Sequence, residues 1–130
     1  MLLNLSNHPS ARWQAVQLQA AAAWGEVVDL PFPVVPPEAD EAEVMAMARA
    51  VLGGLEARLR AAPAGEGHAV HLMGEFSLVA SIWYLARGAR PPLDRVTWLV
   101  STTERVAEVQ PDGTKRSTFT FVRFREVPVR

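Results

Sequence analysis

The sequence predicts an α/β fold in which a mostly parallel sheet carries helices on both faces and an antiparallel hairpin at its C-terminal end. Over residues 2–100, short apolar runs alternate with longer segments of helical periodicity, which is typical of βαβ units and a parallel sheet. Two extended runs follow, and the turn-forming sequence Pro111–Thr114 lies between them, as in a β-hairpin. We therefore expect residues 1–130 to form a single domain, a Rossmann-like three-layer sandwich.

Four short apolar runs are expected to form the parallel strands, in the order 2-1-3-4 and with right-handed crossovers. Pro31 ends the second run, because proline cannot donate to a central ladder. The two hairpin runs add an antiparallel edge. The parallel strands are expected at residues 2–6, 26–30, 68–73 and 96–100, and the hairpin strands at residues 106–110 and 118–127.

Three segments between the strands have helical periodicity. Ser10 can cap the first helix, and Asp40 with Glu43 has the spacing of a capping box at the start of the second. Gly53–Gly54 interrupts the apolar stripe of the second helix, and close packing against a sheet or a partner would explain the pair. A loop is expected at residues 63–67. The helices are expected at residues 10–25, 40–59 and 76–88.

Composition and charge narrow the functional classes. Apolar residues make up 49% of the chain and charged residues 21%, which is ordinary for a globular protein. With 13 basic and 14 acidic residues, the chain has a net charge of only -1, which argues against a duplex nucleic acid as a partner. A small anionic ligand is still compatible with this charge. The absence of cysteine excludes disulfides, thiolate catalysis and zinc–cysteine clusters. The start of the chain lacks the apolar core of a signal peptide, so we expect a cytoplasmic protein with no membrane partner.

Polar residues follow the predicted strands at their carboxyl ends, where open α/β sheets bind ligands. The clearest case is the run at residues 96–100, which stops in hydroxyls, a carboxylate and a guanidinium that cannot be buried without partners. The helix starts at Ser10 and Glu75 would direct backbone N–H groups into the same space, which favours a phosphate or another anion. The expected lining is Ser6, Asn7, His8, Ser10, Gly74, Glu75, Ser101, Thr102, Thr103 and Arg105.

Each of these residues also has a simpler explanation. Asn7 and Ser10 have the chemistry of a turn and a helix cap, and the three hydroxyls of residues 101–103 can satisfy strand-end backbone groups. Glu75 either caps its helix or accepts a ligand hydroxyl. Arg105 either binds an anion or forms an ion pair with Glu104, Glu75 or Glu108.

The sequence also limits the roles that histidines, metal ions and cofactors can have. His8 is the only histidine expected at this edge, since His68 and His71 lie at or inside a strand, and it is a candidate general base. No set of residues has convincing metal-ligand spacing. There is no glycine-rich dinucleotide fingerprint, Walker lysine loop or nucleophile elbow, so we expect neither a metal nor a cofactor.

In layout, the chain resembles the CRISPR-associated Rossmann-fold (CARF) domains and the small stand-alone ring nucleases built on them. The resemblance lies in residues 2–10, in residues 71–75 and above all in a strand that ends Ser-Thr-Thr-Glu-Arg before a terminal hairpin. The chain also resembles short, mostly uncharacterised bacterial proteins that share an Asn-Leu-Ser-Asn-His-Pro start and this Ser-Thr-Thr-Glu-Arg core. CARF sites commonly place a hydroxyl and a basic residue after the fourth strand, which Thr102 or Thr103 and Arg105 match, whereas the glycine-rich helix start is reduced to Gly74.

The resemblance implies a homodimer that binds a cyclic oligoadenylate in antiviral CRISPR signalling and, as a ring nuclease, cleaves it by attack of a ribose 2′-hydroxyl without a metal ion. Arg105, Thr103 and His8 are then the expected catalytic residues, and the remaining lining residues hold the ligand. One alternative is a non-catalytic regulatory or interaction domain. Another is a small enzyme acting on a mononucleotide or a sugar phosphate.

Overall fold

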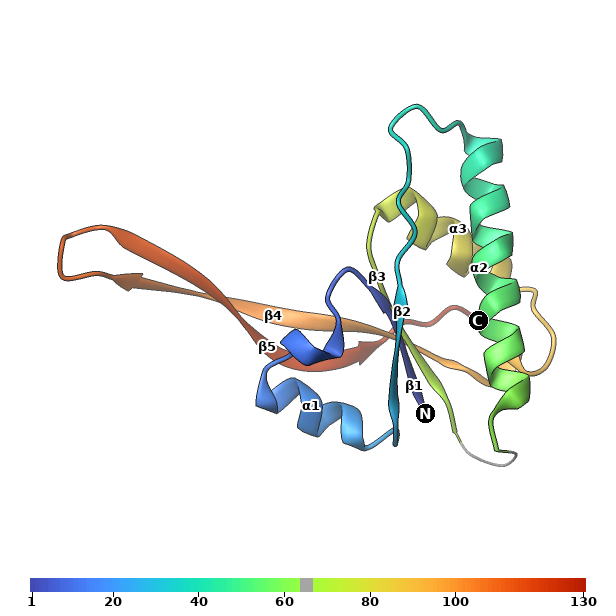
Figure 1. Ribbon diagram of the computed structural model, residues 1–130, viewed down its shortest axis with the longest axis horizontal. Helices are drawn as coiled ribbons and strands as arrows, with labels where there is room; N and C mark the ends of the chain where they lie inside the picture. The colour runs from blue at the N-terminus through green and yellow to red at the C-terminus, as the bar shows by residue number, and fades with distance from the viewer. Residues whose placement is uncertain (64–66) are drawn as a thin grey trace.

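The computed structural model, which describes residues 1–63 and 67–130, is built on a mixed five-stranded sheet (Figure 1). The strand order is β2-β1-β3-β4-β5, with the first four strands parallel and β5 antiparallel to β4. The expected order 2-1-3-4 and the C-terminal hairpin are therefore confirmed. Residues 64–66 of the expected loop lie outside the described residues. The strands are β1 (Leu2–Ser6), β2 (Val27–Pro31), β3 (Ala69–Met73), β4 (Thr97–Val109) and β5 (Lys115–Glu126).

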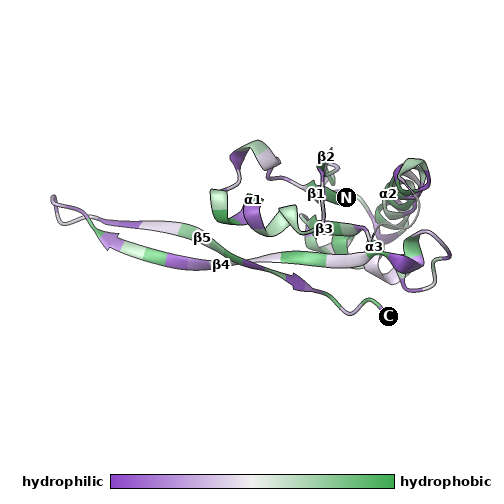
Figure 2. Ribbon diagram, turned by 90° about the horizontal axis from the view of Figure 1, so that it is seen from below, coloured by the Kyte–Doolittle hydropathy of each residue, from purple (hydrophilic) through white to green (hydrophobic). Residues whose placement is uncertain are grey.

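Helices cover both faces of the sheet (Figure 2). The α2 helix (Glu41–Ala61) and the α3 helix (Phe76–Ala86) pack against one face, on strand residues such as Leu3 and Val70. The α1 helix (Ala15–Ala22) lies on the other face, in a smaller cluster that contains Leu2. Alternation of side chains along a strand explains this division, because neighbouring residues point to opposite faces. None of the helices in the described residues is both long and apolar enough to cross a membrane.

The predicted capping box of α2 is present, since Asp40 accepts from the Glu43 N–H and Glu43 accepts from the Asp40 N–H, both at 2.8 Å. Close packing against the sheet does not explain Gly53–Gly54, because a Cβ atom at either glycine would meet nothing within 4 Å. Close packing against a partner stays a prediction.

The prediction for the start of the first helix is also wrong. A 3₁₀ turn spans Ser10–Arg12, and α1 begins only at Ala15 with Gln14 as its N-cap. Ser10 caps neither element. Its N–H and its hydroxyl both donate to the Asp29 carboxylate, at 2.9 and 2.7 Å, so the bonds expected within a helix run to the edge strand β2 instead.

The largest departure from the sequence prediction is the length of β4. Residues 101–105 were expected to leave the sheet as a loop, but β4 continues through them to Val109 and pairs with β5. One irregularity in this pairing lies between Thr102 and Thr103. Residues 97–109 contain no glycine or proline to end a strand, and β-branched residues such as threonine and valine favour one. The β4–β5 hairpin therefore forms a long arm that projects from the helices (Figure 1).

The predicted turn at the tip of the arm is confirmed. Gly113 has a φ of +86°, a conformation that L side chains rarely adopt. Asp112 accepts from the N–H and the hydroxyl of Thr114, which closes the turn. The hairpin thus agrees with the sequence prediction, although its first strand is the continuation of β4 and not a separate element.

Candidate functional site

Four polar side chains form a hydrogen-bonded row across four neighbouring strands, on the sheet face that carries α1. In strand order they are Asp29, Asn4, His71 and Ser101. Asn4 is the centre of the row, because the register places it between Asp29 of β2 and His71 of β3. The successive distances are 2.7 Å from Asn4 Nδ2 to Asp29 Oδ1, 2.8 Å from His71 Nδ1 to Asn4 Oδ1, and 3.1 Å from Ser101 Oγ to His71 Nε2.

The direction of each hydrogen bond in this row follows from the Asp29 carboxylate. An ionised carboxylate only accepts, so the amide nitrogen of Asn4 must face Asp29 and its amide oxygen must face His71. The hydrogen of the neutral His71 ring is therefore on Nδ1. Its Nε2 is left as an acceptor for the Ser101 hydroxyl. The Met73 sulfur, 2.9 Å from Ser101 Oγ, is a second acceptor within reach of that hydroxyl but a weaker one.

The surroundings of the row change the pKa values of two of its members. Burial, and then the nearby His8, lower the pKa of His71 from 6.5 to about 4, so the ring is neutral near pH 7. Partial burial acts to raise the pKa of Asp29, but hydrogen bonds from Ser10 and Asn4 outweigh it and hold the pKa below its ordinary value. Asn4 thus lies between an ionised carboxylate and a neutral imidazole.

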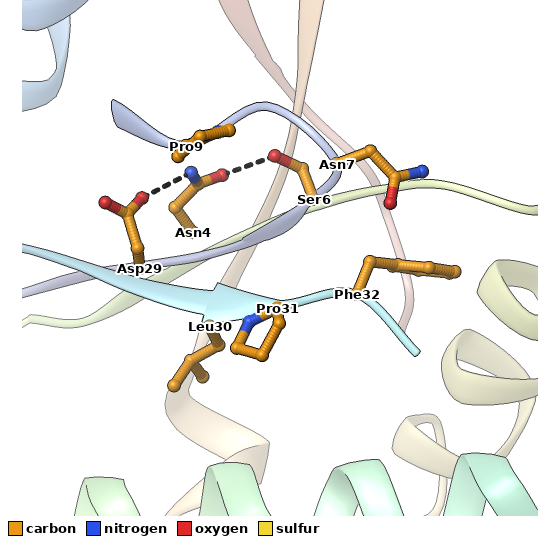
Figure 3. Close-up of a pocket in the computed structure, with 8 residues that line it drawn as sticks. All are labelled: Asn4, Ser6, Asn7, Pro9, Asp29, Leu30, Pro31 and Phe32. Atoms are coloured by element: carbon orange, nitrogen blue, oxygen red, sulfur yellow. Dashed lines mark hydrogen bonds between the residues drawn. The ribbon is translucent and has the colours of Figure 1, made fainter. Parts of the chain in front are cut away.

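Hydrogen bonds within the loop after β1 fix its position beside the row. Asn4 Nδ2 also donates to the His8 carbonyl at 2.9 Å, and the Trp13 indole N–H donates to the same carbonyl at 3.0 Å. The Ser6 hydroxyl donates to Asn4 Oδ1 at 2.9 Å (Figure 3). The side chain of Trp13 then packs edge-on against the His71 ring, with 5.6 Å between the ring centroids. Asn4 therefore both holds this loop and orients the His71 ring.

A cavity of about 450 Å³ lies at the Ser101 end of the row. Its polar groups include the His8 and His71 rings and the Ser101 and Thr103 hydroxyls, and Arg12 contributes a positive charge. Its apolar wall comes from Trp13, in the segment before α1, and from Phe119 and Phe121 of the arm. Its lining is His8, Arg12, Trp13, Gln14, Gln17, His71, Met73, Ser101, Thr103, Phe119 and Phe121.

A second cavity, of about 350 Å³, lies at the other end of the row (Figure 3). Ser6 and Asn7 line it together with Asp29 and the edge of β2, and the Asn7 side chain points away from the row (Figure 3). This cavity has no cationic side chain in its lining, whereas the first has Arg12. An anionic ligand is therefore better matched by the cavity next to Ser101.

One family model, described as Uncharacterized protein MJ1673 family, matches residues 1–125. The chain belongs to this family. The match spans the polar row, both cavities and the whole β4–β5 hairpin except residue 126. No curated protein and no solved structure matches the chain.

In this member of the MJ1673 family, the residues predicted for one site are divided among several places. His8, Ser101 and Thr103 meet at the cavity next to Ser101, whereas Ser6 and Asn7 line the second cavity. The Thr102 hydroxyl donates to the Arg123 carbonyl, across the hairpin. Arg105 lies farther along the arm and donates to the Ser117 hydroxyl at 3.0 and 3.1 Å. Within the described residues, no carboxylate forms the predicted ion pair with Arg105.

The predicted pair of helix starts does not offer free N–H groups to an anion. Ser10 directs its N–H to Asp29, as described above. Glu75 is the N-cap of α3, where its carboxylate accepts from the N–H groups of Ser77 and Leu78. These bonds, first of all that from the Ser77 hydroxyl, lower the pKa of Glu75. Gly74 has a packing role, because a Cβ there would lie 2.5 Å from the Phe32 ring.

Sequence reasoning missed the centre of the site, which consists of Asn4, Asp29 and His71. All three lie inside the predicted strands, whereas the predicted lining residues lie at or after the strand ends. Their signal was nevertheless present, since each is a polar residue inside an apolar run, and a buried polar group requires a partner. Arg12 and Trp13 were missed because the predicted helix began at Ser10, which placed them on helix faces.

Proposed function

We propose that this chain binds a cyclic oligoadenylate between two copies related by a two-fold axis and cleaves it without a metal ion, as in CRISPR-associated antiviral signalling. The observation that carries the proposal is the cavity next to Ser101. It lies where polar residues from β1's loop, β3 and β4 meet, and it combines a cation, two imidazoles and two hydroxyls with aromatic walls. This combination suits a ligand that has both phosphates and planar bases.

The cavity offers separate surfaces to the two parts of a nucleotide. Trp13, Phe119 and Phe121 supply aromatic surface on which an adenine can stack. Arg12 supplies a guanidinium, and Thr103 a hydroxyl, for phosphate oxygens. His8 also lines the cavity and can exchange a proton with the ligand. The phosphate-binding groups are therefore side chains and not helix ends.

The arm supports the dimeric part of the proposal. Val109 and Phe119 are 71% and 65% exposed, and Val106 and Val122 are also exposed, so the arm presents apolar surface to solvent. Val109 and Phe119 share the face of the hairpin that also carries Thr103 and Arg105, because side chains alternate between the two faces along each strand. Two arms packed through this face about a two-fold axis would cover Val109 and Phe119.

Arg105 would contact the ligand in a dimer but not in a single chain. Its guanidinium lies beyond Thr103 on the arm and outside the cavity lining, so it would act on ligand held between the copies. There it would stabilise charge that develops on a phosphate. The bond to Ser117 keeps the guanidinium in a fixed position on the α1 side of the hairpin.

The size of the cavity favours a second candidate, an enzyme acting on a mononucleotide. A volume of about 450 Å³ lies within the range of sites that enclose a small ligand in one chain. Such an enzyme would need no partner copy. Oligomeric state and ligand size therefore distinguish the two candidates.

Native mass spectrometry with cyclic oligoadenylates of several ring sizes, and with AMP as a comparison, tests the proposal. We expect one ring bound for every two chains, together with linear products after incubation. Binding of AMP alone to a monomer would favour the second candidate. Binding of none of these compounds would refute a nucleotide site.

A further inference from the structure

The hydrogen-bonded row reaches the cavity through one pair of side chains, Ser101 and His71. Both line the cavity, although His71 is only 2% exposed. Its Nε2 has a free lone pair directed at the Ser101 hydroxyl, and its Nδ1 is held by Asn4. A hydroxyl that donates to a neutral imidazole, whose other nitrogen is held by an amide oxygen, is the arrangement used to remove protons from nucleophiles.

We propose that Ser101 and His71 accept the proton of the attacking ribose 2′-hydroxyl and that His8 protonates the leaving oxygen, which rests on the proposed cleavage of a cyclic oligoadenylate. Ser101 touches the substrate and is the catalytic residue of the pair. His71 acts through Ser101 and is a positioning residue that stores the proton. His8 lines the same cavity and is exposed, so it can reach the leaving group and exchange protons with solvent.

The proposed step balances without another reactant. The 2′-oxygen forms a bond to phosphorus as its proton passes to Ser101 Oγ, and the hydroxyl hydrogen of Ser101 passes to His71 Nε2. The bond between phosphorus and the 5′-oxygen breaks, and the leaving oxygen takes a proton from the His8 imidazolium. The products are a 2′,3′-cyclic phosphate and a 5′-hydroxyl. Transfer of a proton between the two histidines through solvent restores the starting state.

Charged groups around His71 favour this direction of transfer. Asn4 bonds to both Asp29 and His71, so only its side chain separates the two. The negative charge of Asp29 stabilises the imidazolium once His71 has taken the proton. Burial of the ring and the nearby His8 disfavour its protonation before the substrate arrives, and Arg12 lines the same cavity. A bound phosphodiester supplies a negative charge that offsets the positive groups of the cavity. From β5, the neighbouring side chain is the uncharged ring of Phe124, 5.3 Å from His71 between centroids.

The test compares Ser101→Ala and His71→Asn with His68→Asn, a matched control at the residue directly before β3. Three properties are measured for each: the melting temperature, binding of a cyclic oligoadenylate with 2′-O-methyl groups, and single-turnover cleavage of the unmodified ring at several pH values. We expect Ser101→Ala and His71→Asn to bind the methylated ring and to lose cleavage by about a hundredfold or more, the usual contribution of a general base. His68→Asn should match the wild type in all three.

The pH profile separates proton storage from a purely structural role. In the wild type, cleavage should fall as the pH approaches the value at which His71 becomes protonated, whereas His71→Asn should lose this acidic limb. If His71→Asn cleaves within a few-fold of the wild type, or keeps the limb, the inference is overturned while the proposed function stands. If His71→Asn melts before it can be assayed, Ser101→Ala decides in the same way. If the wild type binds rings but cleaves none, the inference falls together with the cleavage part of the proposed function, while the binding part stands. If it binds none, the inference and the whole proposed function fall.

Discussion

Replacement of Asn4 by alanine is the most severe single change that the polar row predicts. Asn4 is 1% exposed and, among residues 1–63 and 67–130, is the only one that bonds to both Asp29 and His71. In Asn4→Ala, the Nδ1–H of His71 loses its partner, and the Asp29 carboxylate loses its donor from Asn4. The Ser6 hydroxyl is less affected, because it has a second acceptor in the His8 carbonyl at 3.2 Å.

The magnitude follows from these losses. An unsatisfied buried donor costs about 1 to 3 kcal/mol. The bond to Asp29 adds about 0.5 to 1.5 kcal/mol, because this carboxylate is exposed to solvent and keeps its bonds from Ser10, so Asn4→Ala should lower the free energy of unfolding by about 1.5 to 4.5 kcal/mol. Urea denaturation measures this directly. The matched control is Asn7→Ala, whose exposed side chain lies three residues away and should change the value by less than about 0.5 kcal/mol. Equal effects of the two substitutions would refute the central position of Asn4.

Three further predictions concern packing, pH and the arm. In Gly74→Ala, the new Cβ would lie 2.5 Å from the buried Phe32 ring, so we expect a loss of about 1 to 3 kcal/mol in thermal unfolding. Folding lowers the pKa of His71 from 6.5 to about 4, so the contribution of the neutral ring to stability is complete above pH 6.5 and is lost as the pH falls toward 4. This pKa difference corresponds to about 3 kcal/mol, which urea denaturation of the wild type and His71→Asn across this pH range would detect. Arg105→Ala should leave unfolding within about 0.5 kcal/mol of the wild type but weaken binding or turnover of a cyclic oligoadenylate by about 2 to 4 kcal/mol, with Arg58→Ala on α2 as the unaffected control; normal turnover in Arg105→Ala would leave Arg105 with only its bond to Ser117.

The sheet could be predicted because its strands carry strong local signals. Apolar runs bounded by turn residues such as Pro31 fix where three of the parallel strands lie, and the connecting helices restrict their order. The capping box at Asp40 and the turn at Gly113 are also local, since each depends on residues within one turn. These elements were predicted correctly for that reason.

The end of β4 could not be predicted, because it depends on a partner distant in the sequence. Polar residues such as Ser101 and Thr103 suggest that a buried strand has ended, but they are equally stable in an exposed hairpin that pairs with β5. The start of α1 was missed for a similar reason. Ser10 has the chemistry of a cap, and only the fold shows that Asp29 of the edge strand takes its hydrogen bonds.

The structure brings some of the residues predicted for the site together and places the others elsewhere. His8, Ser101 and Thr103 do meet at one cavity. His71 was set aside as a strand residue, although the register with Asn4 turns its ring toward that cavity. Register between distant strands is not encoded locally, so the contact between residues 4 and 71 could be found only from the fold.

Nitrogen-detected NMR of the three histidine side chains during titration with cyclic oligoadenylates tests the central claim most directly, because it reports both binding and its location. Before ligand is added, the His71 signals should show a neutral ring with hydrogen on Nδ1 at pH 7. With ligand, we predict that the His8 and His71 signals shift together while those of His68, directly before β3, stay unchanged. A ligand that shifts His68 alone, or rings that shift no histidine at all, would contradict a nucleotide site at this cavity.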